Sequence, residues 1–501
     1  MFRPGRVVAA LASAAVLLAA TLPGGPVAQA GVLQTYVVVF AQTGLPSDAA
    51  DTITAAGGEL VAGYDAIGVA IARSDSASFR DALLRDGRVL GASATSAFGV
   101  QLNTGLAASE GYGQPPVAVP VSDSDTFSGL QWDMQQIKAV QAHAITGGSA
   151  SVVVGDIDTG LDYTHPDLAA NVDFSRSVSC VGGVPNRSPA AWNDDNGHGT
   201  HTAGTIAAAS NGIGIVGVAP SVKIAAIKAA TPEGFFYPEA VVCSFMWAAT
   251  HGIAVTNNSY FADPWLFNCR NDAAQRAIWL AEQRAIRYAI ARGVTVVAAE
   301  GNENMDLAHR NTDTISPDDA TPLTREVTNA CAIVPVEVPG VVGVSAVGNL
   351  KQKAYYSNYG VGVTQLTAPG GDRRFQVTAQ APNGRVLSTY PAAFFNPASP
   401  LMVQDCAVSP CATYAYLQGT SMAAPHVAGV AALIVSQLGR AEPDRVAGLL
   451  TRTADPLPCP PNPFDPGGTG AFLATCRGGA GSNGFYGSGQ VNAEGAVKAA
   501  S

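Results

Sequence analysis

Three short segments contain residue types that can perform nucleophilic chemistry. Each lies where a strand is expected to end or a helix is expected to begin. Asp158 ends an apolar, strand-like run and is followed by Thr-Gly. His198 lies in Asn-Gly-His-Gly-Thr-His, which opens a helix of small residues, and Ser421 lies in Gly-Thr-Ser-Met-Ala-Ala-Pro-His at the start of a long apolar helix. The unpaired N–H groups and the dipole of a helix start stabilise developing negative charge. A serine becomes a nucleophile when a histidine, oriented by a carboxylate, takes its proton.

Each segment by itself also has an ordinary structural interpretation. An aspartate after a strand is commonly a turn residue, a serine before a helix is commonly an N-cap, and a single histidine is more often structural than catalytic. The joint occurrence of all three, in the chain order Asp, His, Ser, favours catalysis. Met and Ala follow Ser421, so the lipase-type G-x-S-x-G turn is absent and the pattern differs from that of the α/β-hydrolases.

The three segments resemble the subtilisin family of serine peptidases, which carries the blocks strand-Asp-Thr-Gly, His-Gly-Thr-His and Gly-Thr-Ser-Met-Ala-x-Pro-His-Val-Ala-Gly. The resemblance covers about residues 126–497. It implies that Ser421 is the nucleophile, that His198 is the general base, and that Asp158 orients His198 and stabilises its protonated form. The sedolisin relatives replace this histidine with a carboxylate, so the presence of His198 argues against them.

Other titratable side chains lie in the same segments. Asp156 and Asp162 flank the catalytic candidate, but neither precedes Thr-Gly, and Asp156 stands where the family tends to have an apolar residue. His201 and His426 occupy positions that in the family pack behind the site. We therefore expect none of these four residues to belong to the triad.

A tetrahedral intermediate needs hydrogen-bond donors for its negatively charged oxygen. The run 296–303, Val-Val-Ala-Ala-Glu-Gly-Asn-Glu, resembles the strand and turn that carry an asparagine in the family. The resemblance implies that the Asn302 side chain donates a hydrogen bond to this oxygen, together with the backbone N–H of Ser421. The alternative is that Asn302, which follows a glycine, is a turn residue.

The run 255–260 resembles the strand with which an extended substrate pairs in this family. The resemblance implies five substrate-binding residues: Asn258, Ser259 and Tyr260 along the strand, and Gly301 and Glu303 at the pocket for the residue before the scissile bond. Phe261 stands where many family members have glycine, which indicates a narrower groove.

A structural calcium site is a further expectation of the resemblance. The loop 209–215 resembles the family's strong calcium loop, and Asp167, in His-Pro-Asp-Leu, matches its carboxylate ligand. The implied oxygen ligands come from Asp167, Ala209, Asn211, Ile213 and Ile215. Hard oxygen donors of this kind suit calcium, whereas the alternative is a solvated loop beside a helix-capping aspartate. No catalytic cofactor is expected.

The elements that position these residues alternate along the chain after about residue 126. The expected strands are residues 151–155, 222–228, 253–257, 294–299 and 341–347, and the expected helices are residues 199–209, 238–251, 272–292 and 421–438. Apolar, β-branched strands between helices predict a parallel sheet that is covered on both faces. The fold class is therefore α/β, a three-layer α/β/α subtilisin-like domain over residues 126–501 with a mostly parallel sheet.

The residues before this domain divide into three parts. Residues 1–30 have a basic start, an apolar run too short to span a membrane as an anchor, and Ala-Gln-Ala before residue 31, so they are interpreted as a signal peptide. Residues 31–100 predict a small α+β (ferredoxin-like) unit of order β-α-β-β-α-β. Residues 101–125, rich in Gly, Ala, Ser and Pro, predict a linker. The small unit is interpreted as an inhibitor-like propeptide released by cleavage in the linker; the alternative is a permanent N-terminal domain.

Composition narrows the remaining choices. The 501 residues carry a net charge of −10. A nucleic-acid-binding protein needs a basic face, so this acidic balance argues against that class. The eight cysteines of an exported chain predict disulfides. The local pairs Cys406–Cys411 and Cys459–Cys476 are expected, and Cys243, in a helical context, is the cysteine expected to remain a buried thiol if any does.

These observations together predict a secreted, extracellular serine endopeptidase that cleaves peptide bonds through an acyl-enzyme on Ser421. Its expected partners are protein or peptide substrates and its own propeptide, without nucleic acid or, after signal removal, a membrane, and it is expected to be a monomer. Two alternatives remain: a processing peptidase of narrow specificity, and a non-catalytic or prodomain-locked binding protein. The intact triad argues against the second.

Overall fold

The computed structural model describes residues 31–95, 123–261, 265–317, 323–479 and 481–501. The signal peptide expected over residues 1–30 lies outside the described residues, and so does nearly all of the expected linker.

A seven-stranded sheet forms the centre of the large domain, and its strand order is β15-β14-β10-β8-β5-β7-β6. Every neighbouring pair in this sheet is parallel. The strands are β5 (Val153–Asp158), β6 (Val178–Ser179), β7 (Lys223–Lys228), β8 (Val255–Asn258), β10 (Thr295–Ala299), β14 (Val342–Val347) and β15 (Leu366–Pro369). The predicted parallel sheet is therefore confirmed, with strand boundaries within about three residues of those expected.

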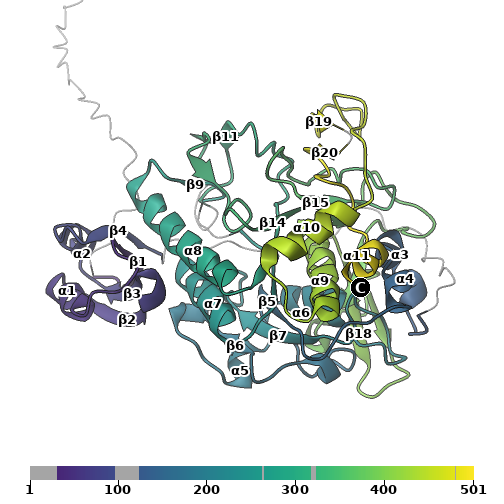
Figure 1. The fold of residues 1–501 in the computed structure, drawn as a ribbon, viewed down its shortest axis with the longest axis horizontal. Helices are drawn as coiled ribbons and strands as arrows, with labels where there is room; N and C mark the ends of the chain where they lie inside the picture. The colour runs from purple at the N-terminus through teal and green to yellow at the C-terminus, as the bar shows by residue number, and fades with distance from the viewer. Residues whose placement is uncertain (1–30, 96–122, 262–264, 318–322, 480) are drawn as a thin grey trace, which may run out of the picture.

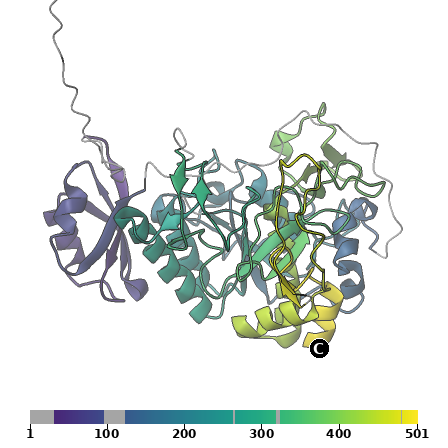
Figure 2. The same cartoon turned by 90° about the horizontal axis from the view of Figure 1, so that it is seen from above.

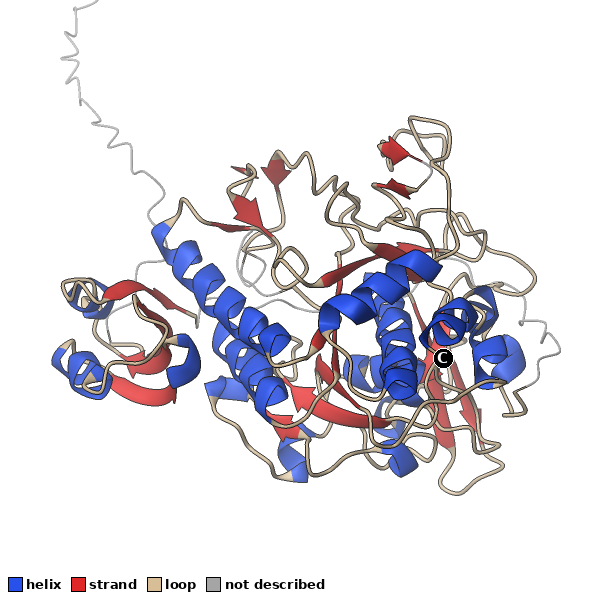
Figure 3. Ribbon diagram, viewed as in Figure 1, coloured by secondary structure: helices blue, strands red, loops and turns tan. Residues whose placement is uncertain are grey.

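Helices cover both faces of this sheet and make the domain three-layered (Figures 1 and 3). One face carries α6 (His198–Ala207), α9 (Thr420–Leu438), α10 (Pro443–Thr453) and α11 (Ala493–Ala500), and the other carries α7 (Pro238–Thr250) and α8 (Ala273–Ala291). The shorter helices are α3 (Trp132–Gln136), α4 (Ala139–His143) and α5 (Pro189–Trp192), with 3₁₀ turns η2 (Ser128–Leu130), η3 (Ala169–Asn171), η4 (Val181–Gly183) and η5 (Ala392–Phe394).

Helix α9 is the central helix of its layer. In the part of the chain that the structure describes it is the one helix long and apolar enough to cross a bilayer, but 78% of its apolar window is buried inside the protein. Its small and aliphatic residues, among them Ala424, Val427 and Ala431, pack against the sheet instead. Close packing of this kind is what the Ala- and Val-rich sequence of the helix permits.

The small N-terminal unit is a four-stranded antiparallel sheet with two helices. Its elements are β1 (Gln34–Phe40), α1 (Ala49–Ala55), β2 (Glu59–Tyr64), η1 (Asp65–Ile67), β3 (Val69–Ser74), α2 (Phe79–Leu83) and β4 (Val89–Ala94). The strand order is β2-β3-β1-β4. The observed order β-α-β-β-α-β is the one that the sequence predicted, because the alternating apolar strands and the Gly57-Gly58 break mark the element boundaries.

The small unit packs its sheet against α7 and α8 (Figures 1 and 2). Val37, Val39, Val69 and Ile71 on one face of its sheet belong to the same apolar core as these two helices. Arg284 of α8 donates from Nη1 to the carbonyl oxygens of Phe40 (2.8 Å) and Ile67 (3.1 Å). The unit is therefore docked through both apolar and polar contacts.

Segments outside the sheet add small antiparallel pairs. The strands β16 (Val386–Thr389), β17 (Met402–Asp405) and β18 (Ala412–Leu417) form a three-stranded sheet before the Ser421 helix. The two-stranded pairs are β9 (Asn268–Cys269) with β13 (Cys331–Ala332), β11 (Thr312–Asp313) with β12 (Arg325–Glu326), and β19 (Gly478–Gly479) with β20 (Ser482–Asn483).

All eight cysteines form disulfides. The expected pairs Cys406–Cys411 and Cys459–Cys476 are confirmed. The expectation that Cys243 could remain a thiol is wrong, because it bonds to Cys180, 63 residues away. Helix α7 and the turn η4, which begins directly after Cys180, lie side by side in the fold, a proximity that local sequence does not encode.

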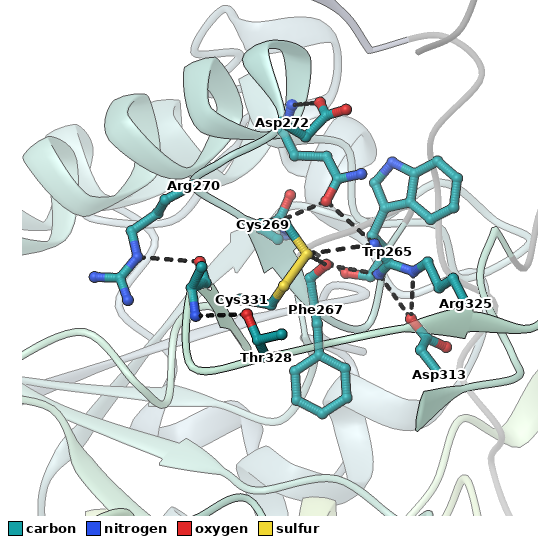
Figure 4. Close-up of a disulfide and its surroundings, with 12 residues drawn as sticks. Trp265, Phe267, Cys269, Arg270, Asp272, Asp313, Arg325, Thr328 and Cys331 are labelled. Atoms are coloured by element: carbon teal, nitrogen blue, oxygen red, sulfur yellow. Dashed lines mark hydrogen bonds and ion pairs between the residues drawn. A yellow bond between two sulfur atoms is a disulfide. The ribbon is translucent and has the colours of Figure 1, made fainter. Parts of the chain in front are cut away.

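The fourth disulfide, Cys269–Cys331, joins β9 to β13 (Figure 4). Arg325 lies beside it, donates from Nη2 to Asp313 Oδ2 (2.7 Å), and holds its guanidinium carbon 4.5 Å from the centre of the Trp265 ring. Trp265 also packs against the apolar core of the small unit. The disulfide therefore anchors a segment that contacts the N-terminal unit.

Candidate active site

The structure brings Asp158 and His198 into direct contact. Asp158 is the last residue of β5 and points to the face of the sheet covered by α6, because residues 154, 156 and 158 alternate with the residues facing α7 and α8. His198 is the first residue of α6, after Gly197 at φ 105°. Its Nδ1 lies 2.7 Å from Asp158 Oδ1, and both side chains are buried. This contact leaves Nε2, the other ring nitrogen of the imidazole, free of Asp158 and able to accept a proton.

The Asp158 carboxylate is held by the backbone as well. The N–H of Thr159 donates to its Oδ1 (2.7 Å), whereas Oδ2 has no hydrogen-bond partner among the described residues. A fixed carboxylate in a buried setting favours one tautomer of the neighbouring imidazole, with the proton on Nδ1.

Ser421 is the second residue of α9 and lies beside β8. Its hydroxyl donates to the backbone carbonyl of Ser259 (3.0 Å), and the Ser259 hydroxyl donates to the carbonyl of Ser421 (2.9 Å). The Ser421 hydroxyl must leave the Ser259 carbonyl before it can attack a substrate, and catalytic hydrogen bonds are often long or absent without substrate. The reciprocal pair of bonds fixes the start of α9 against the end of β8.

Asn302 lies in the turn after β10, with its amide oriented by Thr420. Its Oδ1 accepts hydrogen bonds from the backbone N–H (2.9 Å) and the hydroxyl (3.1 Å) of Thr420. The amide nitrogen therefore points away from Thr420. Both this nitrogen and the N–H of Ser421 lie within 3.7 Å of the position that a side chain on Gly419 would take. Two donors that converge on one small space are the arrangement that an oxyanion requires.

Asp194 was missed by the sequence analysis and organises the loops around the site. Its carboxylate accepts from the N–H of Gly197 (2.9 Å), the N–H of Thr200 (2.9 Å) and the hydroxyl of Thr159 (2.9 Å). It therefore caps the start of α6 and ties that start to the residue after Asp158. An aspartate shortly before a Gly-rich helix start is a capping signal that could have been used.

Three of the competing residues, Asp162, His201 and His426, are engaged by other groups. Asp162 accepts from Thr164 in a local turn. His201 is buried with its Nε2 3.0 Å from the carbonyl of Ala415, and burial lowers the pKa of His201 to about 3. His426 lies 3.0 Å from Asp133 Oδ2. None of the three contacts Ser421.

The three substrate-binding residues expected on the strand 255–260 are buried, and the Ser259 hydroxyl is bonded to the Ser421 carbonyl. Asn258 donates from Nδ2 to the carbonyl of Val297 (2.9 Å), and the ring of Tyr260 stacks on Phe236 with centroids 4.3 Å apart. These three side chains are engaged inside the protein, so only the backbone of this strand remains for pairing with a substrate.

Gly301 and Glu303 lie next to each other beside the Asn302 turn. A side chain on Gly301, at φ 101°, would meet Glu303 Oε2 at 2.7 Å. Glu303 accepts a hydrogen bond from Nδ2 of Asn358 (2.6 Å), and burial raises the pKa of Glu303 to about 7. A partly buried carboxyl therefore adjoins the proposed oxyanion donors.

The loop 209–215 lies against two aspartates. Asp167 Oδ2 accepts from the N–H of Ile215 (3.1 Å) and the hydroxyl of Tyr414 (3.0 Å), and Asp125 Oδ2 accepts from the N–H of Asn211 (3.0 Å). Oδ1 of each aspartate is buried without a hydrogen-bond partner in the described residues. Burial raises the pKa of Asp167 to about 8. No group of three or more His, Cys, Asp and Glu residues suited to a metal occurs within the described ranges. Two orphaned carboxylate oxygens beside a loop of carbonyls nevertheless fit a hard cation.

The protein is a serine peptidase of three-layer α/β architecture. Residues 149–489 match the model of the Subtilase family, and the chain belongs to that family. It is 30% identical to Subtilisin BL of Lederbergia lenta over 371 residues, which cover 74% of this chain and 99% of that protein.

Solved structures of peptidases are also similar to this chain. A lanthipeptide protease, 26% identical, superposes with a TM-score of 0.54 over 74% of this chain and 94% of its own. The epidermin leader peptide processing serine protease of Staphylococcus aureus has a TM-score of 0.66 at 21% identity and covers 94% of this chain and 99% of its own, which shows a shared fold. The protein is thus a subtilisin-like serine endopeptidase, as the sequence predicted.

Proposed function

We propose that Ser421, His198, Asp158 and Asn302 are the catalytic residues of this endopeptidase. His198 takes the proton of the Ser421 hydroxyl as this attacks a peptide carbonyl, and it later gives a proton to the leaving amine. Asp158 holds the imidazole and stabilises its positive charge, while Asn302 and the Ser421 N–H hold the negative oxygen. The observation that carries the proposal is the 2.7 Å contact between His198 at the start of α6 and Asp158 at the end of β5. The bond from Thr420 N–H to Asn302, directly beside Ser421, supports the oxyanion role.

A fluorophosphonate probe tests this assignment, because it reacts with an activated serine. The matured enzyme should be labelled on Ser421, and His198→Ala should remove most labelling while the protein still melts cooperatively. Labelling of another residue would contradict the assignment of Ser421. No labelling of the wild-type enzyme would favour a non-catalytic binding protein.

We further propose that residues 31–100 are a propeptide that inhibits the enzyme, and that the signal peptide 1–30 directs export. The docking of the small unit on α7 and α8, and the hydrogen bond from the Tyr64 hydroxyl to the carbonyl of Gly183 (2.7 Å), support the inhibitory role. Four disulfides support an oxidising, extracellular destination. Cleavage within residues 101–125 would release a monomeric catalytic domain, 126–501.

Calcium is proposed as a structural ion beside the loop 209–215. Asp167 and Asn211 would supply side-chain oxygens, and Ala209, Ile213 and Ile215 would supply carbonyl oxygens. Asp125, absent from the expected set, offers a further carboxylate. The bound ion would join the loop to Asp167 and leave the triad chemistry unchanged, with no catalytic cofactor.

The substrates are proteins or peptides, and a narrow processing specificity is the second candidate. The likeness to a lanthipeptide protease and the partly buried Phe261 beside the substrate strand favour it. Cleavage profiling with a proteome-derived peptide library decides between them: broad activity supports a general endopeptidase, and a single sequence motif supports a processing enzyme.

A further inference from the structure

Asp156 is a buried carboxyl group two residues before Asp158 on the same strand. Side chains alternate along a strand, so both aspartates face α6. Asp156 is 2% exposed and pairs in register with Asn257 on β8 and Ala226 on β7. An apolar residue would fill this interior position at lower cost, because an unpaired polar group is destabilising there. Its contacts indicate what it does.

One oxygen of Asp156 contacts the helix that carries the general base. Thr202 Oγ1 lies 2.7 Å from Asp156 Oδ2 and 3.1 Å from the carbonyl of Gly199. Thr202 follows His198 by four residues, one turn along α6. When Asp156 is protonated on Oδ2, it donates to Thr202 Oγ1, and the Thr202 hydroxyl then donates to the Gly199 carbonyl.

The other oxygen connects to the residues that hold the nucleophile. Asn257 donates from Nδ2 to Asp156 Oδ1 (2.8 Å) and to the hydroxyl of Ser259 (3.1 Å). Ser259 exchanges two hydrogen bonds with Ser421. A continuous series of hydrogen bonds therefore runs from Thr202 through Asp156, Asn257 and Ser259 to Ser421.

We propose that Asp156 is a positioning residue that, in its protonated form, sets the His198 helix α6 and the strand β8, whose end holds Ser421, at a fixed distance from each other. The proposal rests on the triad assigned above. Asp156 acts through Thr202 and Asn257 and touches neither the substrate nor the reacting atoms. Geometry of this kind matters because a displacement of about 1 Å in an active site can cost roughly 100-fold in rate.

The charged groups around Asp156 favour the protonated form. Burial, and next the negative charge of Asp158, raise the pKa of Asp156 well above its usual value. Hydrogen bonds from Asn257 and Thr202 lower this pKa by less, and the charge of Asp194 raises it slightly. From α6, His198 is engaged by Asp158, and His201 is buried with a pKa of about 3. From β7, Lys228 is bonded to the Thr159 carbonyl and to Asp195, and no ion pair joins Asp156 to a basic side chain in the described ranges.

Ionisation of Asp156 has a predictable effect on the enzyme. The Thr202 hydroxyl then donates to Asp156 Oδ2 and gives up its bond to the Gly199 carbonyl, and a second anion lies beside Asp158, so the spacing of the two halves of the site changes. The rate constant kcat should therefore fall on the alkaline side of the pH profile, while substrate binding, which depends on other residues, changes little.

The test compares Asp156→Asn, Asp156→Val and the wild type as full-length precursors that mature by themselves. Asparagine is neutral and can both accept from Asn257 and donate to Thr202. Asp156→Asn should therefore retain most of the wild-type kcat and lose the alkaline fall. Asp156→Val should lower kcat roughly 10- to 100-fold with KM little changed, and Thr202→Val should lower it in the same direction.

Glu282→Gln, which removes a buried carboxyl on α8, is the matched control and should keep the alkaline fall. Active-site titration corrects each rate for the fraction of matured enzyme, so poor maturation of Asp156→Val is not mistaken for a lower kcat. The pH profile of Asp156→Asn tests the proposal without the valine variant. An unchanged alkaline fall in Asp156→Asn, or a loss of activity equal to that of Asp156→Val, overturns the proposal. Failure of the triad assignment is distinct, since the wild type would then show no labelling of Ser421.

Discussion

Thr420 donates two hydrogen bonds to Oδ1 of Asn302, one from its backbone N–H at 2.9 Å and one from its hydroxyl at 3.1 Å. Since the oxygen of the amide is held in this way, its nitrogen is left for the site. The residue next to the proposed nucleophile thus orients the side chain proposed to stabilise the intermediate.

We predict that Asn302→Leu lowers kcat by roughly 100- to 1000-fold with little change in KM, a range measured for loss of such a donor in subtilisin itself. The reason is that the donor acts on charge that exists only in the transition state. Thr420→Val, which removes one of the two bonds to Oδ1, should give a smaller loss. Steady-state kinetics on a chromogenic peptide measures both, and a KM effect without a kcat effect in Asn302→Leu would contradict the prediction.

Ser421→Ala should yield an uncut precursor. The hydroxyl is the proposed nucleophile both for substrates and for the bond in the linker, and alanine removes it with little change in volume. Intact mass and N-terminal sequencing provide the measurement: wild type should give a product that begins between residues 100 and 125, and the variant should keep the small unit.

Addition of a trace of active enzyme to the Ser421→Ala precursor is the control, because cleavage at the same bond demonstrates that the variant is folded and its linker accessible. A wild-type protein that begins at Gly31 and is fully active would show that the small unit is a permanent domain.

Calcium should raise the melting temperature of the matured enzyme, and a chelator should lower it. A ligand that binds only the native state stabilises it by about 2.7 kcal/mol at 100 times its Kd. Asp167→Asn should abolish the difference between calcium-loaded and chelated samples, whereas Glu494→Gln, on the surface of α11, should leave it unchanged. Equal melting temperatures for both wild-type samples would argue against the ion.

Inhibition by the propeptide should weaken as pH rises. Glu239 is buried on the first turn of α7, near Ile71 of the small unit, and its Oε2 has no hydrogen-bond partner among the described residues. Burial raises the pKa of Glu239 above its ordinary value of 4.5, and it does the same for Glu282 on α8. A raised pKa means that the protonated acid favours the docked state. The stabilisation is therefore complete below pH 4.5 and is lost as pH rises through the raised value.

The measurement is the inhibition constant of the cleaved propeptide for the matured enzyme, determined in buffers from acidic to alkaline pH. Glu239→Gln stays neutral at every pH, so its inhibition constant should vary less with pH than that of the wild type. A wild-type constant independent of pH, or an identical dependence in both proteins, would show that Glu239 does not control release.

The sequence by itself determined the class of the protein and indicated the residues proposed for its chemistry. Asp158, His198 and Ser421 lie in short blocks whose types and order are specific, and the apolar, β-branched runs around them predict buried parallel strands. These features are local: a strand, a Gly turn or a helix start is encoded by residues adjacent in the chain, so element types and approximate boundaries could be predicted from it.

Only the tertiary structure decided which distant residues meet. The bond between Cys180 and Cys243 and the approach of Asp125 to Asn211 join residues that are 63 and 86 positions apart in the chain. Asp156 is the clearest case. The sequence marks it as unusual for its strand, but its role depends on Thr202 and Asn257, which a parallel sheet and its covering helix bring to it from 46 and 101 residues away.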